Sequence, residues 1–110
     1  MVIERGHIYR VNLDPTVASE QQGNARPCVV LSLIAYNRKL RTVGVVPLTS
    51  TPRALPPLIV PVPSAGKTES MALCNQIRTI DKSRIIKHLG AVSSEDLSAI
   101  ESGVRKVHGL

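Results

Sequence analysis

The side chains best suited to catalysis lie in a polar loop and at the end of an apolar run. Glu20 and Arg26 belong to the loop Thr16–Pro27, and the hydroxyl residues Thr49 and Ser50 end an apolar run. A guanidinium can hold a phosphate with two hydrogen bonds and stabilise the added negative charge of a pentavalent transition state. Thr49 could donate a hydrogen bond to the same phosphate, and Glu20 could accept the proton of a ribose 2′-hydroxyl. Together they would support RNA cleavage without a metal, the substrate supplying its own nucleophile.

The same residues also fit a purely structural interpretation. Arg26 would then cap the loop, Thr49 and Ser50 would form a turn, and Glu20 would be solvated. Residue types alone do not decide between these two interpretations.

Other kinds of catalytic site find little support. The chain contains no Walker sequence, no G-x-G-x-x-G and no Gly-x-Ser-x-Gly elbow. Cys28 and Cys74 lie inside apolar runs, which predicts buried free thiols rather than a disulfide or a nucleophile. The histidines are scattered and show no metal-ligand spacing: His7, His88 and His108. We therefore expect neither a metal nor a cofactor.

Size and charge limit the classes of protein to which this chain can belong. A length of 110 residues predicts one domain over residues 1–110. A net charge of +6 favours polyanionic partners, nucleic acid first. Basic residues cluster at Arg38–Arg41 and Arg78–His88, although a solvated face is the favoured interpretation of either cluster by itself. With Tyr9 and Tyr36 as the only aromatic residues, base-stacking platforms are disfavoured.

The apolar runs of the sequence show neither of the patterns that direct a protein to a membrane. The sequence opens without a signal-peptide pattern, and no window is long and apolar enough to span a bilayer. We expect a soluble, cytoplasmic protein without a membrane partner.

Most of the chain that must position these groups has the pattern of strands. His7–Leu13 alternates as a half-buried strand does, and Cys28–Leu33 and Thr42–Leu48 are apolar runs typical of buried strands. Prolines bracket Leu58–Val62, which predicts an edge strand. Ser70–Cys74 and Gln76–Ile80 are predicted to be short strands or one bent strand.

Helical patterns are fewer. Ile34–Lys39 is either one helical turn or an irregular connection, and Asp81–Ile86 fits a short helix. Ser93 followed by Asp96 resembles a capping box, with Val92 and Leu97 placed as a hydrophobic staple. The apolar residues beyond follow helical spacing: Leu97, Ile100, Val104 and Val107. We predict a mainly β fold with α (α+β), a small twisted barrel or curled sheet with a C-terminal helix covering one face.

Six motifs in order give a more specific indication. They are Arg5–Tyr9, Asn12–Thr16, Ser19–Gly23, Arg26–Ser32, Pro47–Ser50 and Gln76–Arg84. Each motif alone is weak, but their order and spacing over nearly the whole chain are highly specific. The chain resembles the MazF/PemK (Kid) family of toxins from type II toxin–antitoxin modules.

This resemblance implies an SH3-like small β-barrel of the CcdB/MazF type, assembled as a homodimer. It implies a sequence-specific endoribonuclease that needs no metal and inhibits translation and growth. Its substrate would be single-stranded mRNA, cleaved to leave a 2′,3′-cyclic phosphate and a 5′-hydroxyl. It also implies a cognate antitoxin protein, partly disordered, that binds the dimer and blocks the RNA groove.

The resemblance also assigns roles to residues. Arg26 and Thr49 match the catalytic pair of one branch, and Glu20 matches a loop glutamate with a catalytic part in some members. An unperturbed guanidinium is a very poor base, so Arg26 is expected to stabilise charge or to assist as an acid. The Kid branch has histidine, arginine and aspartate at the positions of Ser19, Leu73 and Asn75. A mechanism with a dedicated imidazole is therefore not available to this chain.

The expected RNA-binding residues surround this catalytic group. Asn75 and Gln76 carry side-chain amides that can pair with base edges. Arg78 either holds a phosphate or braces the turn at Asp81. The full expected set is Ser19, Gln21, Gln22, Ser50, Asn75, Gln76 and Arg78.

Two other functions stay open at this point. One is a non-catalytic toxin of the same fold that acts by binding a protein such as gyrase, or a catalytically impaired family member. The other is a small basic RNA-binding protein without enzymatic activity, whose mark would be uniform, salt-sensitive binding. The joint presence of Glu20, Arg26 and Thr49 disfavours the first, and the scarcity of aromatic residues disfavours the second.

Overall fold

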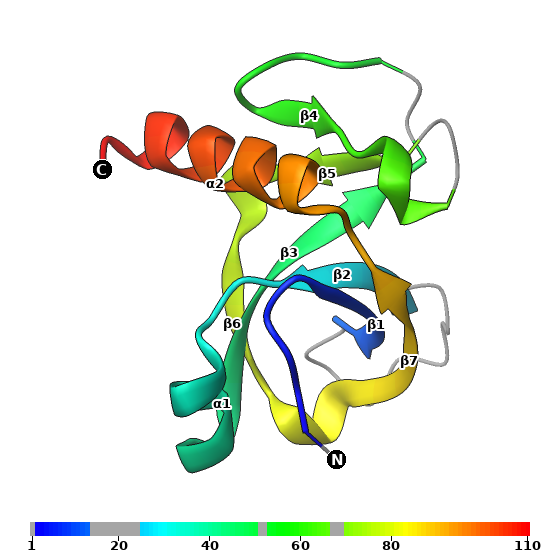
Figure 1. Cartoon of the computed structure of the whole chain (residues 1–110), viewed down its shortest axis with the longest axis vertical. Coiled ribbons are helices and arrows are strands. Elements are labelled where there is room, and N and C mark those ends of the chain that lie inside the picture. The colour runs from blue at the N-terminus through cyan, green and yellow to red at the C-terminus, as the bar shows by residue number, and fades with distance from the viewer. Residues whose placement is uncertain (1, 14–24, 51–52, 67–69) are drawn as a thin grey trace.

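The computed structural model describes residues 2–13, 25–50, 53–66 and 70–110, which form a curled antiparallel sheet with one long helix packed on it (Figure 1). The strands are β1 (His7–Asn12), β2 (Ala25–Val30), β3 (Thr42–Thr49), β4 (Ile59–Pro61), β5 (Met71–Leu73), β6 (Arg78–Asp81) and β7 (Ile85–Ala91). The helices are α1 (Ile34–Lys39) and α2 (Ser94–His108), with single 3₁₀ turns η2 (Pro63–Ala65), η3 (Cys74–Gln76) and η4 (Lys82–Arg84). This arrangement confirms the predicted α+β class.

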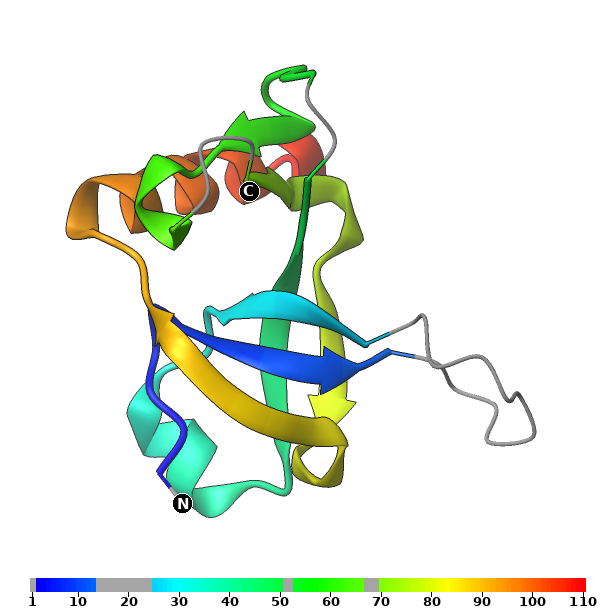
Figure 2. The same ribbon diagram turned by 90° about the vertical axis from the view of Figure 1, so that its right-hand side faces the viewer.

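Strand β3 joins the two halves of the sheet. The strand order is β4-β5-β3-β2-β1-β7, and β6 pairs with the first half of β3 while β5 pairs with its end. In Figure 2, β3 runs from the lower group formed by β1, β2 and β7 up to the group formed by β4, β5 and α2. The sheet is not closed, so the predicted barrel is an open, curled one.

Both faces of the central strands are buried, which explains the continuous apolar runs of β2 and β3. One cluster packs against α2: Ile8, Val29, Val46, Leu48, Val60, Val62, Ala72, Cys74, Ile100 and Val104. The other lies against the opposite face of these strands: Ile3, Tyr9, Val11, Leu13, Cys28, Val30, Val43, Val45 and Ile80. Alternate residues of each central strand therefore enter different cores.

Helix α2 begins as the sequence predicts, with one difference in its cap. The Ser93 hydroxyl accepts a hydrogen bond from the Asp96 N–H at 3.1 Å. The Asp96 carboxylate does not return to Ser93. It accepts from the N–H of Ser64 at 2.8 Å and from the Ser64 hydroxyl, which in turn accepts from the Ser93 N–H. The helix start is thereby tied to η2, which lies beside the pocket described below.

Two predicted elements are wrong at their boundaries or in their type. The loop before β2 was expected to last until Pro27, but β2 already begins at Ala25, so Arg26 is a strand residue. The short helix predicted for Asp81–Ile86 is absent: Asp81 ends β6, η4 follows, and β7 starts at Ile85. Strand β7 is largely exposed at the edge of the sheet, so its sequence carries no burial pattern that distinguishes a strand.

Other predictions are confirmed. Ile34–Lys39 forms α1, and β4 is the edge strand at one end of the sheet. Both cysteines are buried and free. Within the described ranges, no helix is both long and apolar enough to cross a membrane.

Candidate functional site

Arg26 and Thr49 lie on the neighbouring strands β2 and β3, where the pairing of these strands ends. The last paired residues are Cys28 and Pro47, and the same register carried two residues further sets Arg26 opposite Thr49. Pro27 and Pro47 have no N–H to continue the ladder, and β5 pairs with the end of β3 along its other edge. Both side chains are half-buried. Arg26 and Thr49 therefore lie near the ends of adjacent strands, at a place where the backbone pairing has stopped.

The charges of two guanidinium groups act on the thiol of Cys28. Burial raises the pKa of Cys28 to about 12, and the nearby charges of Arg26 and Arg78 oppose that rise. The Cys28 Sγ donates to the backbone carbonyl of Arg26 at 3.7 Å. A thiol with this pKa stays protonated at neutral pH, so Cys28 is not a nucleophile.

The surroundings of Arg78 bear on its two predicted roles. Arg78 is exposed and begins β6, opposite Val45 of β3. The Asp81 carboxylate accepts from the N–H of Ser83 at 2.8 Å, which lowers the pKa of Asp81, and lies 3.9 Å from the Arg41 guanidinium. Ser83 and Arg41 therefore brace that turn, which favours the phosphate-binding role for Arg78.

The remaining predicted residues divide into two groups. Ser50, Asn75 and Gln76 are exposed, Ser50 directly after β3 and the two amides on η3, which links β5 to β6. Strand β5 begins opposite Thr49 and runs antiparallel to β3, so the two amides lie further back along β3, between the level of Leu48 and that of Val45. Four residues lie outside the described part of the chain: Ser19, Glu20, Gln21 and Gln22.

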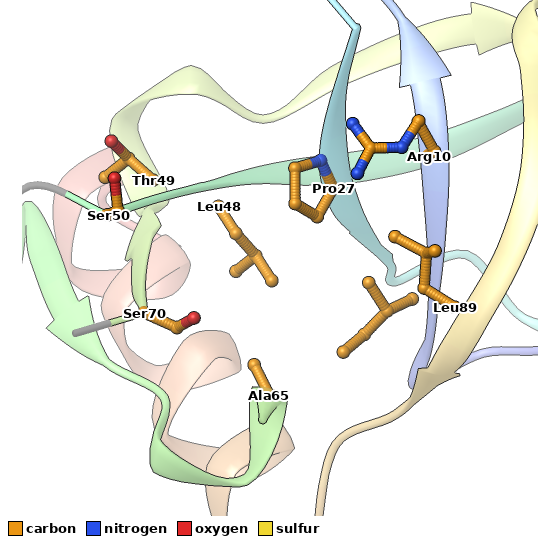
Figure 3. A pocket seen from close by; sticks show the side chains of 9 residues that line it. Arg10, Pro27, Leu48, Thr49, Ser50, Ala65, Ser70 and Leu89 are labelled. Carbon is orange, nitrogen blue, oxygen red and sulfur yellow. The ribbon is translucent and has the colours of Figure 1, made fainter. Parts of the chain in front are cut away.

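A pocket of about 370 Å³ opens beside Thr49. Its lining residues are Ile8, Arg10, Pro27, Leu48, Thr49, Ser50, Ala65, Ser70 and Leu89. Figure 3 shows Arg10, Leu48 and Leu89 reaching toward one hollow, with Thr49 and Ser50 at one end of it. Sequence reasoning missed Arg10. Its position two residues after buried Ile8, on the same face of an alternating strand, is the signal that could have found it.

The comparisons with known proteins decide the family. A model of the PemK-like, MazF-like toxins of type II toxin–antitoxin systems matches residues 4–108. The chain belongs to this family. The MazF/PemK assignment made from the ordered motifs is therefore confirmed.

Relatives in the PemK/MazF family are named endoribonucleases. The endoribonuclease toxin MazF of Escherichia coli K12 is 33% identical over 109 residues, covering 98% of this chain and 96% of that protein. The endoribonuclease PemK of Escherichia coli is 40% identical over 82 residues, a match that covers 72% of this chain and 61% of that protein.

Solved structures of MazF proteins share the fold. MazF of Deinococcus radiodurans superimposes with a TM-score of 0.83 at 27% identity, covering 100% of this chain and 99% of that one. A mycobacterial endoribonuclease in complex with its cognate antitoxin gives a TM-score of 0.79 at 28% identity, covering 98% and 96%. The toxin fold therefore extends over the whole described chain.

Proposed function

We propose that this member of the MazF/PemK toxins is a metal-independent endoribonuclease that cleaves single-stranded mRNA and thereby inhibits translation. The family membership and the endoribonuclease relatives support the reaction class. The observation that carries the proposal is the placement of Arg26 and Thr49 on adjacent strands, at the end of their pairing and beside a pocket.

The proposed reaction is an internal transesterification. The 2′-oxygen forms a bond to phosphorus and the bond from phosphorus to the 5′-oxygen breaks, leaving a 2′,3′-cyclic phosphate and a 5′-hydroxyl. One proton leaves the 2′-hydroxyl and one reaches the 5′-oxygen, so no atom is gained or lost. Negative charge accumulates on the phosphate oxygens in the transition state, where guanidinium and hydroxyl donors are most effective.

Each residue has one part in this proposal. Arg26 holds and neutralises the reacting phosphate, and Thr49 donates a hydrogen bond to it. Glu20 accepts the proton of the 2′-hydroxyl. Arg78 binds a neighbouring phosphate, which its exposed position and its share in the field around Cys28 support.

The base-reading residues of the proposal are polar side chains at the rim. Asn75 and Gln76 pair with base edges, and Ser50 supports them from the end of β3. Ser19, Gln21 and Gln22 contact the RNA from the loop.

We also propose that the protein acts as a homodimer controlled by an antitoxin. A mycobacterial relative has been solved with its cognate antitoxin, which supports a protein inhibitor for this chain. Leu33, Tyr36 and Leu40 follow helical spacing around α1, and each is at least half exposed. Large apolar residues exposed together favour a protein partner.

The test is cleavage of mRNA by the purified protein in EDTA, followed by analysis of the new ends. We expect fragments with a 2′,3′-cyclic phosphate and a 5′-hydroxyl, and no cleavage of a matched oligonucleotide with a 2′-deoxyribose at the scissile position. Intact RNA with folded protein would refute the proposal. Cleavage of the deoxy-substituted oligonucleotide would refute the mechanism alone.

A further inference from the structure

The pocket beside Thr49 is built on a straight row of residues across the sheet. Arg10 of β1 pairs with Pro27 of β2, and the β2–β3 register continued by one residue sets Pro27 opposite Leu48 of β3. Pro27 has a short, flat ring, so the middle of the row is low while Arg10 and Leu48 rise on either side. Leu89 of β7 and Ala65 of η2 add walls, as Figure 3 shows. The hollow therefore follows from one proline between two long side chains.

The lining of this pocket suits a ligand that is partly apolar and rich in hydrogen-bond acceptors. Among the described residues that line it, the one charged group is the Arg10 guanidinium, and the other polar side chains are the hydroxyls of Thr49, Ser50 and Ser70. None of these described lining residues carries a carboxylate. Within the described part of the chain, Arg10 forms no ion pair, although it is only half-exposed. A guanidinium held over an apolar floor without a partner is ready to bind one.

We infer that this pocket holds one unpaired nucleotide of the RNA substrate, next to the scissile phosphate, and that Arg10 is a specificity-determining residue. This inference rests on the proposed function. The base lies against the apolar wall formed by Leu48 and Leu89, and Arg10 contacts its Hoogsteen acceptors or stacks on its face. The chain offers no aromatic platform here, and a guanidinium plane is the other surface on which unstacked bases are held.

A nucleotide fits these observations better than a segment of a protein partner. Thr49 is both a lining residue and the proposed hydrogen-bond donor to the reacting phosphate, so the occupant is continuous with the bond that breaks. The volume of about 370 Å³ lies near the lower end of the range for small-ligand pockets, which suits a single nucleotide rather than a helix.

The experiment compares the wild type with Arg10→Ala, Arg10→Lys and Arg38→Ala on a random-sequence RNA library in EDTA, with sequencing of the new 5′ ends. Arg38 is an exposed cation on α1, so its variant matches the charge change at a distant place. We expect Arg10→Ala to lose the base preference at one position flanking the cut and to raise KM at least tenfold on a preferred oligonucleotide. Arg10→Lys should recover part of the KM but not the preference, because a point charge lacks the guanidinium fork.

A second variant protects the test against misfolding. Leu89 is 40% exposed, so Leu89→Trp can fill the pocket without disturbing either core. We expect Leu89→Trp to alter the preference at the same position as Arg10→Ala, with melting temperatures near the wild-type value. Unchanged preferences in both folded variants would overturn the inference. Failure of the wild type to cleave would instead count against the proposed function.

Discussion

At the scale of single residues, the proposed site is rich in cations. The charges of Arg26 and Arg78 both act on Cys28, and Arg10 lies on β1, which pairs with β2. A bound polyanion would offset the repulsion between such like charges. The proposed phosphate-binding roles therefore give a reason for cations in this part of the sheet.

Cys28 makes the first prediction at this scale. Its pKa is about 12 in the folded chain against an ordinary 9.0, so folding keeps its proton. The stability that the protonated thiol contributes is fully present below pH 9 and is lost as the pH rises toward 12. At pH 10 we expect Cys28 alone to remove about 1.4 kcal/mol from the free energy of unfolding.

The measurement is urea unfolding of the wild type and of Cys28→Ala between pH 8 and pH 11. The wild type should lose more stability over this range than the variant does. Parallel pH profiles would show that Cys28 ionises as readily in the folded chain as in the unfolded one.

At the scale of elements, β3 positions the site because it belongs to both halves of the sheet. On one edge it pairs with β6 over residues 42–45 and with β5 at Leu48 and Thr49. On the other edge it pairs with β2 over residues 45–47, and this ladder stops at Cys28 and Pro47. Thr49 therefore lies beyond the end of the β2 ladder, on a part of β3 that β5 still holds.

Helix α2 gives a prediction at this scale, since Gly103 lets it approach the sheet closely. A Cβ at Gly103 would lie 2.6 Å from the Cys74 Sγ and 3.1 Å from the carbonyl oxygen of Pro57. We expect Gly103→Ala to lower the free energy of unfolding by about 1–3 kcal/mol, despite the better helix propensity of alanine.

The control is the double variant Gly103→Ala with Cys74→Ala, measured by chemical denaturation. Removing the sulfur should restore part of the loss, so the two substitutions should couple favourably. Additive losses would place the clash at the Pro57 backbone instead.

Several elements could be predicted from the sequence because the pattern of each is carried by residues close together in the chain. The alternation of β1 and the capped amphipathic pattern of α2 depend only on neighbouring residues. Strand β7 could not be predicted, because most of its side chains are exposed and it follows Lys82–Arg84, which forms a 3₁₀ turn. Arg10 could not be predicted for a related reason. It lines a pocket only because β1 pairs with β2 and β7, and this pairing is not visible in the sequence.

At the scale of the whole molecule, a net charge of +6 accompanies exposed apolar residues on α1. The charge suits a polyanionic substrate, and the apolar surface suits a protein partner. We predict a dimer, with a mass in solution near twice 11.9 kDa by light scattering at micromolar concentration. A mass near that of one chain would contradict the dimer and leave the catalytic proposal standing.

The central claim is that Arg26 stabilises the reacting phosphate of a metal-free RNA cleavage. Single-turnover cleavage of one RNA oligonucleotide in EDTA, by the wild type, Arg26→Ala and Arg38→Ala, tests it most directly. We expect Arg26→Ala to be slower by roughly 10²- to 10³-fold, the effect typical of removing one transition-state donor, while Arg38→Ala stays near the wild-type rate. A folded Arg26→Ala protein that cleaves as fast as the Arg38→Ala control would contradict the account.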